Sequence, residues 1–187
     1  MGHPGDTATG GWTYSEYARL PDDGNRYEVL DGEVLVTPAP TPHHQRIVGR
    51  LFLGLVEYVE PKGHGWVLQD VDLLLAPGQF LRPDLVVVPS KDRAGVTDRG
   101  VERPPALAVE VVSPSSRTVD RQAKPGRYLD FGVPTCWVVD PFETVVWVWD
   151  RDTGPAKPRR LQKTLQWTFP EGARPLELEV AGLVAPL

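Results

Sequence analysis

Two runs of valine and leucine constrain the fold of this chain more than any other feature. They are LRPDLVVV at residues 81–88 and ALAVEVVS at residues 106–113. A strand that is covered on one face alternates apolar and polar residues, whereas a strand covered on both faces is apolar almost throughout. The two runs therefore predict central strands of a sheet with other elements packed on both faces.

A long amphipathic helix is predicted ahead of these strands. Thr41 followed by Pro42 is a helix-start pair, and residues 61–63 contain the proline and glycine that end the run. Between them, apolar residues recur at the helical spacing on one stripe: Ile47, Val48, Leu51, Phe52, Leu55, Val56 and Val59. Further upstream, residues 27–36 predict a β-hairpin that turns at Asp31-Gly32.

The remaining segments complete a mixed sheet flanked by helices, an α/β or α+β arrangement. We expect a short helix at 13–20, strands at 66–75, 134–141 and 144–150, a second helix at 117–131, and edge strands in a proline-interrupted extension at 151–187. A length of 187 residues fits one domain. We therefore expect a flexible N-terminus at 1–12 and a single domain at 13–187.

Composition excludes several kinds of protein. The single cysteine, Cys136, excludes an intramolecular disulfide and a cysteine-cluster zinc site. The sequence contains no signal-peptide pattern and no apolar segment of membrane-spanning length, so we expect a cytoplasmic protein without membrane contact. The net charge of −5 argues against a broad DNA-binding surface. Residues 81–127 nevertheless hold nine basic and six acidic side chains, which leaves room for a local phosphate-binding patch.

Two carboxylates interrupt the valine-rich runs. Asp84 lies near the start of one predicted strand and Glu110 near the end of the other. A buried carboxylate is costly unless it is paired, hydrogen-bonded or bound to a cation. Hard oxygen ligands of this kind suit Mg²⁺ or Mn²⁺. Taken singly, an aspartate in a turn and a glutamate paired with a buried arginine are the more common uses of these residues.

A family resemblance rests on longer strings of the sequence. The segments YEVLDGEVLVTPAPTPHHQRIVGRL, RPDLVVV, PALAVEVVSPSSRTVDRQAK and YLDFGVPTCWVVDP, in this order, resemble the Uma-two family of restriction-endonuclease-like proteins over residues 26–150. The resemblance implies a PD-(D/E)xK nuclease core with Mg²⁺ or Mn²⁺ held by Asp84 and Glu110.

The lysine of that motif departs from its simplest position. Two residues after Glu110 stands Val112, and Lys124 matches the place of a lysine that has moved to the following helix. Pro125 directly follows Lys124 and disfavours helical geometry there. Lys124 then either begins a helix or points elsewhere, and Arg121 is the alternative cation.

Glu33 and His44 also match family positions. Glu33 could supply an oxygen ligand, and His44 could contact phosphate or carry a proton near neutral pH. A solvated hairpin glutamate and an exposed histidine at a helix start are the ordinary alternatives.

Two functional hypotheses follow. The first is a metal-dependent endonuclease that hydrolyses phosphodiester bonds in DNA, with Asp84, Glu110, Lys124, Glu33 and His44 as site residues and a homodimer that cuts both strands. The second is a nuclease-like scaffold of weak or no activity that binds nucleic acid or another protein. The sequence does not distinguish DNA from RNA.

Overall fold

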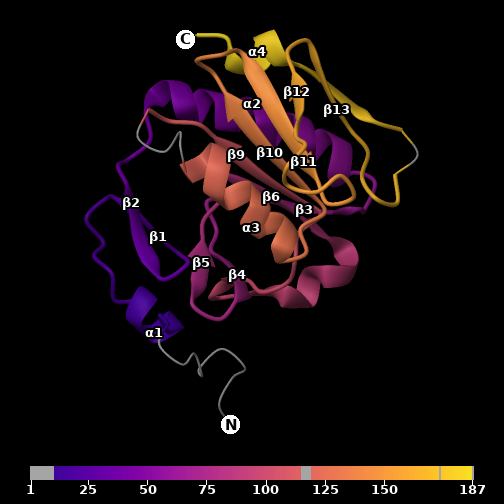
Figure 1. The fold of residues 1–187 in the computed structure, drawn as a ribbon. Helices are drawn as coiled ribbons and strands as arrows, with labels where there is room; N and C mark the ends of the chain where they lie inside the picture. Colours follow the sequence, from indigo (N-terminus) through magenta and orange to yellow (C-terminus); the bar gives the residue numbers. More distant parts are fainter. Residues whose placement is uncertain (1–10, 115–118, 173, 187) are drawn as a thin grey trace.

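The computed structural model describes residues 11–114, 119–172 and 174–186, with a central six-stranded mixed sheet (Figure 1). Its strand order is β12-β11-β10-β9-β6-β3. Strands β9 and β10 are parallel, and the other neighbours are antiparallel. The bounds are β3 (Gly65–Gln69), β6 (Leu85–Pro89), β9 (Leu107–Val111), β10 (Thr135–Asp140), β11 (Val145–Asp150) and β12 (Arg159–Leu161).

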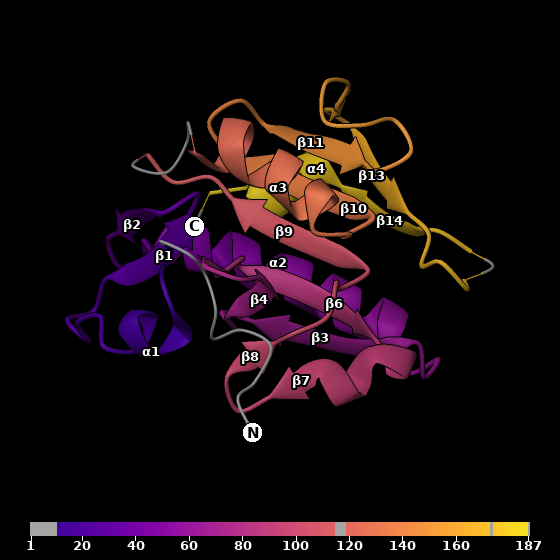
Figure 2. The same cartoon turned by 60° about the horizontal axis from the view of Figure 1, so that its bottom comes forward.

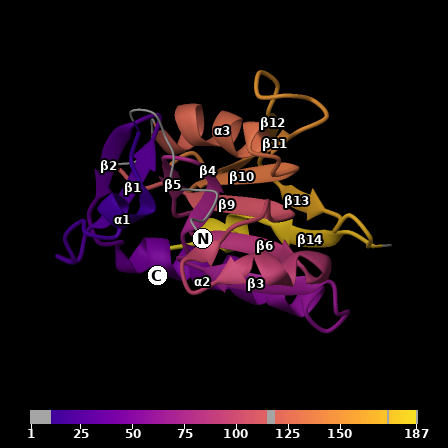
Figure 3. The same ribbon diagram turned by 90° about the horizontal axis from the view of Figure 1, so that it is seen from below.

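Helices cover both faces of this sheet. Helix α2 (Pro42–Val59) lies on one face and α3 (Lys124–Asp130) on the other, so the molecule has three layers when it is viewed along the sheet (Figure 3). Every residue of β6 and β9 is buried, as expected of strands with two covered faces. This is the mixed sheet with flanking helices that the sequence predicts.

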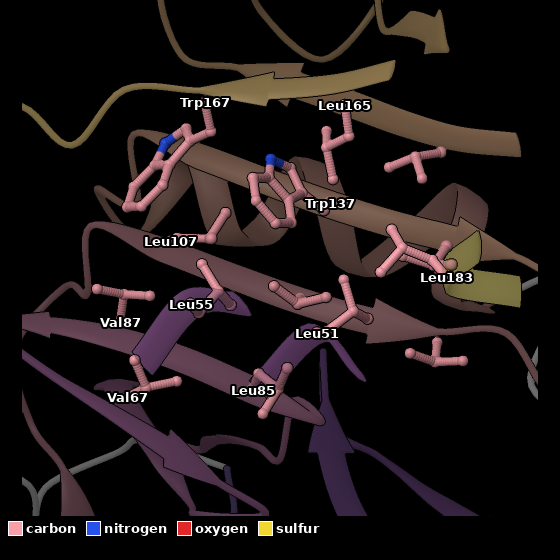
Figure 4. Close-up of a cluster of buried hydrophobic side chains, with 14 of the residues drawn as sticks. Leu51, Leu55, Val67, Leu85, Val87, Leu107, Trp137, Leu165, Trp167 and Leu183 are labelled. Carbon is pink, nitrogen blue, oxygen red and sulfur yellow. The ribbon is translucent and has the colours of Figure 1, made fainter. Parts of the chain in front are cut away.

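Alternation along β9 divides the core in two. Leu107, Val109 and Val111 belong to the apolar cluster on the α2 side, whereas Ala108 belongs to the cluster on the α3 side. Figure 4 shows Leu51 and Leu55 of α2 among the strand residues of the first cluster. Burying each such leucine contributes roughly 1.5–3 kcal/mol. The same alternation turns Glu110 toward α3.

Helix α2 begins where the sequence places it. The Thr41 hydroxyl accepts a hydrogen bond from the His44 amide (3.2 Å), and Pro42 occupies the first turn. This start places His44 in the first turn of α2, next to the end of β9.

A second sheet lies beyond one end of the first, with the strand order β2-β1-β5-β4-β8-β7 (Figure 2). Its strands are β1 (Arg26–Leu30), β2 (Glu33–Thr37), β4 (Leu73–Ala76), β5 (Gln79–Leu81), β7 (Val96–Thr97) and β8 (Gly100–Val101). Asp31 and Gly32 have φ angles of 54° and 85°, and they connect β1 to β2. Strand β1 meets β5 at the single residue pair Val29 and Phe80. Helix α1 (Tyr14–Tyr17), which has a capping box, packs beside this sheet through Tyr17.

Two predicted strands are each divided between the sheets. The segment 66–75 becomes β3 and β4, and 81–88 becomes β5 and β6. The first division occurs at Asp70, which has a φ angle of 50° and turns the chain. The second occurs at residues 82–84, where Pro83 offers no amide hydrogen for a ladder.

The predicted helix at 117–131 has two parts. A π-helical turn η2 (Val119–Ala123) leads into α3, while residues 117–118 lie outside the described range. Pro125 lies in the first turn of α3, directly after this π-helical turn.

The C-terminal extension packs onto α2. Strands β13 (Thr164–Trp167) and β14 (Leu176–Glu179) pair with each other, and residues 180–184, which were expected as strand, form α4 (Val180–Val184). Leu165, Trp167 and Leu183 join the apolar cluster of α2 (Figure 4).

A 3-10 turn η1 (Ser90–Gly95) follows β6. Within the residues that the structure describes, no helix has the length and apolarity to cross a membrane.

Candidate active site

Asp84 and Glu110 meet at the end of the β6–β9 ladder. The antiparallel register pairs Leu85 with Val109, so Asp84 and Glu110 occupy the next opposite positions. Cross-strand neighbours of this kind present their side chains on the same face. The Val111 amide, one residue beyond Glu110, donates to Asp84 Oδ2 at 2.7 Å. The start of β6 and the end of β9 thus bring together two residues that are 26 positions apart in the sequence.

Asp84 is 3% exposed and is surrounded by donors. His44 Nε2 lies 3.3 Å from Asp84 Oδ2 and 3.0 Å from the Val111 carbonyl oxygen, and Arg26 donates to Asp84 Oδ1 at 3.0 Å. Burial alone would raise the pKa of Asp84. The hydrogen bond and charge of His44, together with Arg26 and the Val111 amide, instead hold this pKa below its ordinary value. Asp84 is therefore kept as a buried anion.

His44 is correspondingly held by Asp84. Burial lowers the pKa of His44, but the hydrogen bond and charge of Asp84 outweigh burial and leave the pKa above its ordinary value. The His44 ring, in the first turn of α2, therefore contacts both Asp84 and the end of β9 and holds Asp84 in place.

Lys124 is buried among three carboxylates. Its Nζ lies 2.7 Å from Glu28 Oε2, 3.2 Å from Asp120 Oδ1 and 3.3 Å from Glu110 Oε1, and its side chain is 3% exposed. Burial lowers the pKa of Lys124, whereas Glu110, Glu28 and Asp120 raise it well above the ordinary value. The ammonium is thus charged and fixed in position.

Glu110 is buried near three other carboxylates. The Tyr128 hydroxyl donates to Glu110 Oε1 at 2.5 Å. Burial raises the pKa of Glu110 well above its ordinary value; Lys124 opposes this rise, and the carboxylates of Asp120, Glu28 and Asp84 add to it. An additional cation near these acids would relieve their repulsion.

A pocket of about 200 Å³ connects these groups. One wall is the segment from Thr37 to Thr41, between β2 and α2, and His44, Val111 and Ser113 also line the pocket. The charged residues among its described lining are four acids and two bases besides His44: Glu28, Asp84, Glu110, Asp120, Arg26 and Lys124. With all six ionised, the pocket has an excess of two negative charges.

The sequence of this chain matches the model of a known protein family. The model of the Uma2 (Uma-two) family, described as "Putative restriction endonuclease", matches residues 14–181. The chain belongs to the Uma2 family. The match is longer than the 26–150 stretch on which the sequence resemblance rests, and it includes most of the C-terminal extension.

A solved structure has the same fold as this Uma2 chain. It is the crystal structure of a "putative nuclease belonging to DUF820" from Anabaena variabilis ATCC 29413, with a TM-score of 0.77 and 16% sequence identity. The superposition covers 93% of this chain and 98% of the other. No protein among those with curated functions is significantly similar to this chain.

The Uma2 pocket contains four of the five site residues expected from the sequence: Asp84, Glu110, Lys124 and His44 line it. Glu33 is exposed at the start of β2 and is not among the described residues that line the pocket. The alternative cation, Arg121, lies 2.9 Å from Glu143 and 3.4 Å from Asp140, above the ring of Trp147, and it does not line this pocket either.

Glu28 is a site residue that sequence reasoning missed. It is 1% exposed; its Oε2 contacts Lys124, and its Oε1 accepts a hydrogen bond from the Arg82 amide at 2.7 Å. The available signal was the one that marks Asp84 and Glu110, a carboxylate within an apolar strand. Glu28 therefore connects the lysine of α3 to the segment that carries Asp84.

Proposed function

We propose that this protein is a metal-dependent endonuclease that hydrolyses phosphodiester bonds in DNA. The observation that carries the proposal is the Lys124 ammonium, buried 3.3 Å from Glu110 in a pocket that Asp84 shares. Membership of the Uma2 family and the nuclease-like fold support the nuclease assignment. The choice of DNA over RNA rests on the restriction-endonuclease description of the family.

The pocket has the donor set and the charge for Mg²⁺ or Mn²⁺. Asp84 and Glu110 offer hard oxygen ligands, and the acids among the described lining outnumber the lysine and arginine side chains by four to two. No group of three or more histidine, cysteine, aspartate or glutamate side chains placed for metal binding occurs within the described ranges. Water or substrate oxygens would therefore complete the coordination. A bound ion would lower the pKa of a water ligand and neutralise charge on the phosphate.

The protein's own residues act around that ion. Lys124 Nζ would donate to a phosphate oxygen or orient the attacking water, and groups that are preorganised in this way typically contribute several kcal/mol to the lowering of a barrier. Tyr128 and Glu28 hold Glu110 and Lys124, respectively, in place. His44 holds Asp84, and its position on the pocket wall also suits contact with a phosphate.

We further propose a homodimer, because two sites related by a two-fold axis match the two antiparallel strands of a duplex. Strand β11, with its two tryptophans, is a poor contact for such a dimer. It is covered by β12; Trp149 is buried against the α3 side, and Arg121 and Arg160 lie over Trp147. Light scattering that shows a monomer at high concentration would contradict the dimer.

A cytoplasmic location, suggested by the single cysteine, would give access to cellular DNA.

One observation favours the alternative of a nuclease-like scaffold that binds nucleic acid or protein without cutting. Arg26 bridges Asp84 and Asp70, at 3.0 Å from each, and so neutralises Asp84 without a metal ion. A scaffold would keep this pair permanently. A nuclease would let a divalent ion share Asp84 with Arg26.

The deciding experiment is a cleavage assay paired with a binding measurement. Supercoiled plasmid, single-stranded DNA and RNA are incubated with the protein and Mg²⁺, Mn²⁺ or EDTA, while Mn²⁺ binding is measured by calorimetry. Asp84→Asn, Glu110→Gln and Lys124→Met should each abolish cleavage, and Glu57→Gln, on the exposed face of α2, should not. Binding of Mn²⁺ without cleavage of any nucleic acid would favour the scaffold.

A further inference from the structure

A second pocket adjoins the candidate active site. It has a volume of about 360 Å³ and lies beside the first pocket, with Arg26, Pro38, Pro40, His44 and Asp84 in the walls of both. A group bound in the second pocket would therefore lie next to one bound at Asp84. The size is within the range of small-molecule sites, which starts at roughly 300 Å³.

The two pockets differ in charge. Besides His44, the second has two guanidinium groups, from Arg26 and Arg82, and two carboxylates, from Asp70 and Asp84, among its described lining. These charges balance, whereas the first pocket has an excess of negative charge. The excess of acids favours a cation in the first pocket, whereas the second lacks that excess and suits a neutral polar group.

Two side-chain amides supply the polar recognition. Gln45, in the first turns of α2, and Gln69, at the end of β3, both line the second pocket. Both glutamines are exposed, and within the described part of the chain no hydrogen bond engages either side-chain amide, so each is open to a ligand. Each amide offers a donor and an acceptor side by side, the pattern that pairs with the edge of a nucleobase. Pro38, Pro40 and Val48 add apolar surface to the same pocket, which a base could cover with its flat face.

We propose that this second pocket, lined by Gln45 and Gln69, binds the nucleobase next to the cleaved phosphate. The proposal rests on the nuclease function proposed above and specifies its substrate. A base that enters a recess has left the stack, so the nucleotide beside the cut is unpaired or turned out of the duplex. Single-stranded DNA, or a duplex that opens locally, is therefore the preferred form of substrate.

The test uses the full-length protein in metal-free buffer with dAMP as the probe. We expect the side-chain amide NMR signals of Gln45 and Gln69 to shift on addition of dAMP. Gln45→Ala and Gln69→Ala should each raise the Kd for dAMP roughly three- to tenfold. Gln166→Ala is the matched control, since Gln166 is exposed on β13 and pairs with Glu177 outside both pockets, and its Kd should equal that of the unmodified protein.

Competition identifies which part of the nucleotide is bound. Deoxyadenosine should displace dAMP, and inorganic phosphate should not. A single-stranded oligonucleotide should displace dAMP more effectively than a blunt duplex of the same sequence. The proposal is overturned if phosphate alone reproduces the amide shifts, or if the Kd is unchanged in both glutamine variants.

Failure of this inference and failure of the nuclease function give different results. If cleavage requires Asp84 and Glu110 but the Kd for dAMP is the same in both glutamine variants, the base site is wrong and the nuclease function stands. If dAMP binding depends on the glutamines but no nucleic acid is cleaved, the pocket binds a base and the nuclease function is wrong.

Discussion

Lys124 Nζ and Glu28 Oε2 lie 2.7 Å apart, although 96 positions separate the two residues in the sequence. Both side chains are almost completely buried, at 3% and 2% exposure. Glu28 comes from a hairpin outside the central sheet, and Lys124 comes from the helix on its face. The position of the lysine is thus set by a strand that belongs to another sheet.

This contact predicts that Glu28→Ala weakens both stability and activity. The change leaves the buried Lys124 with one carboxylate fewer and removes the acceptor of the Arg82 amide, so we expect a loss of about 3 kcal/mol in the free energy of unfolding. Urea denaturation measures the loss, with Glu57→Ala as the control for removing an exposed glutamate. A Glu28→Ala protein as stable as the control would contradict the contact.

Asp84 and Glu110 should respond differently to neutralisation in metal-free buffer. Asp84 is paired with Arg26 and His44, so Asp84→Ala leaves cations without their partner and should cost about 3 kcal/mol. Glu110→Gln keeps an acceptor for Tyr128, and Lys124 keeps Glu28 and Asp120. Its stability should therefore stay within about 1 kcal/mol of that of the unmodified protein. Equal losses in the two variants, in urea denaturation, would contradict this difference.

A divalent cation should stabilise the unmodified protein. At a concentration of Mn²⁺ 100 times its Kd, the expected gain is about 2.7 kcal/mol, seen as a rise in Tm. The rise should vanish in Asp84→Asn and in Glu110→Gln. A similar rise in both variants would place the binding of Mn²⁺ elsewhere on the chain.

His44→Ala should weaken binding of the metal without removing a ligand. Loss of a group that orients a ligand typically lowers metal affinity or activity about 10–100-fold. Calorimetry with Mn²⁺ measures the change. The matched control is His43→Ala, because the ring of His43 lies 3.2 Å from the Val184 carbonyl oxygen, on the side of α4. Unchanged affinity in His44→Ala would mean that Asp84 keeps its position without the ring.

Parts of this site follow directly from local sequence. Asp84 and Glu110 stand out because a carboxylate inside a run of valines needs a partner, and that reasoning requires no knowledge of the distant chain. The start of α2 is equally local, since Thr41 and Pro42 define it. Such features depend on residues within one turn or one strand of each other.

Other parts depend on packing that sequence patterns do not reveal. The direction of Lys124 depends on a π-helical turn that ends just before it, and periodicity analysis assumes regular helix. A carboxylate within an apolar strand marks Glu28 as a candidate, but its contact with Lys124 comes from the docking of β1. The division of 66–75 occurs at Asp70, which has a positive φ angle. The contact between Lys124 and Glu28 joins segments that lie far apart in the chain, so no local pattern predicts it.

The hairpin's single backbone pairing with β5, between Val29 and Phe80, bears on how the site comes into being. The central sheet and its helices could form while the hairpin is still loose, and Lys124 would then lack Glu28. Local opening of one element costs less than global unfolding. We therefore expect any opening of this hairpin to separate Glu28 from Lys124, so that an opened chain would keep Asp84 and Glu110 but would lack an ordered lysine.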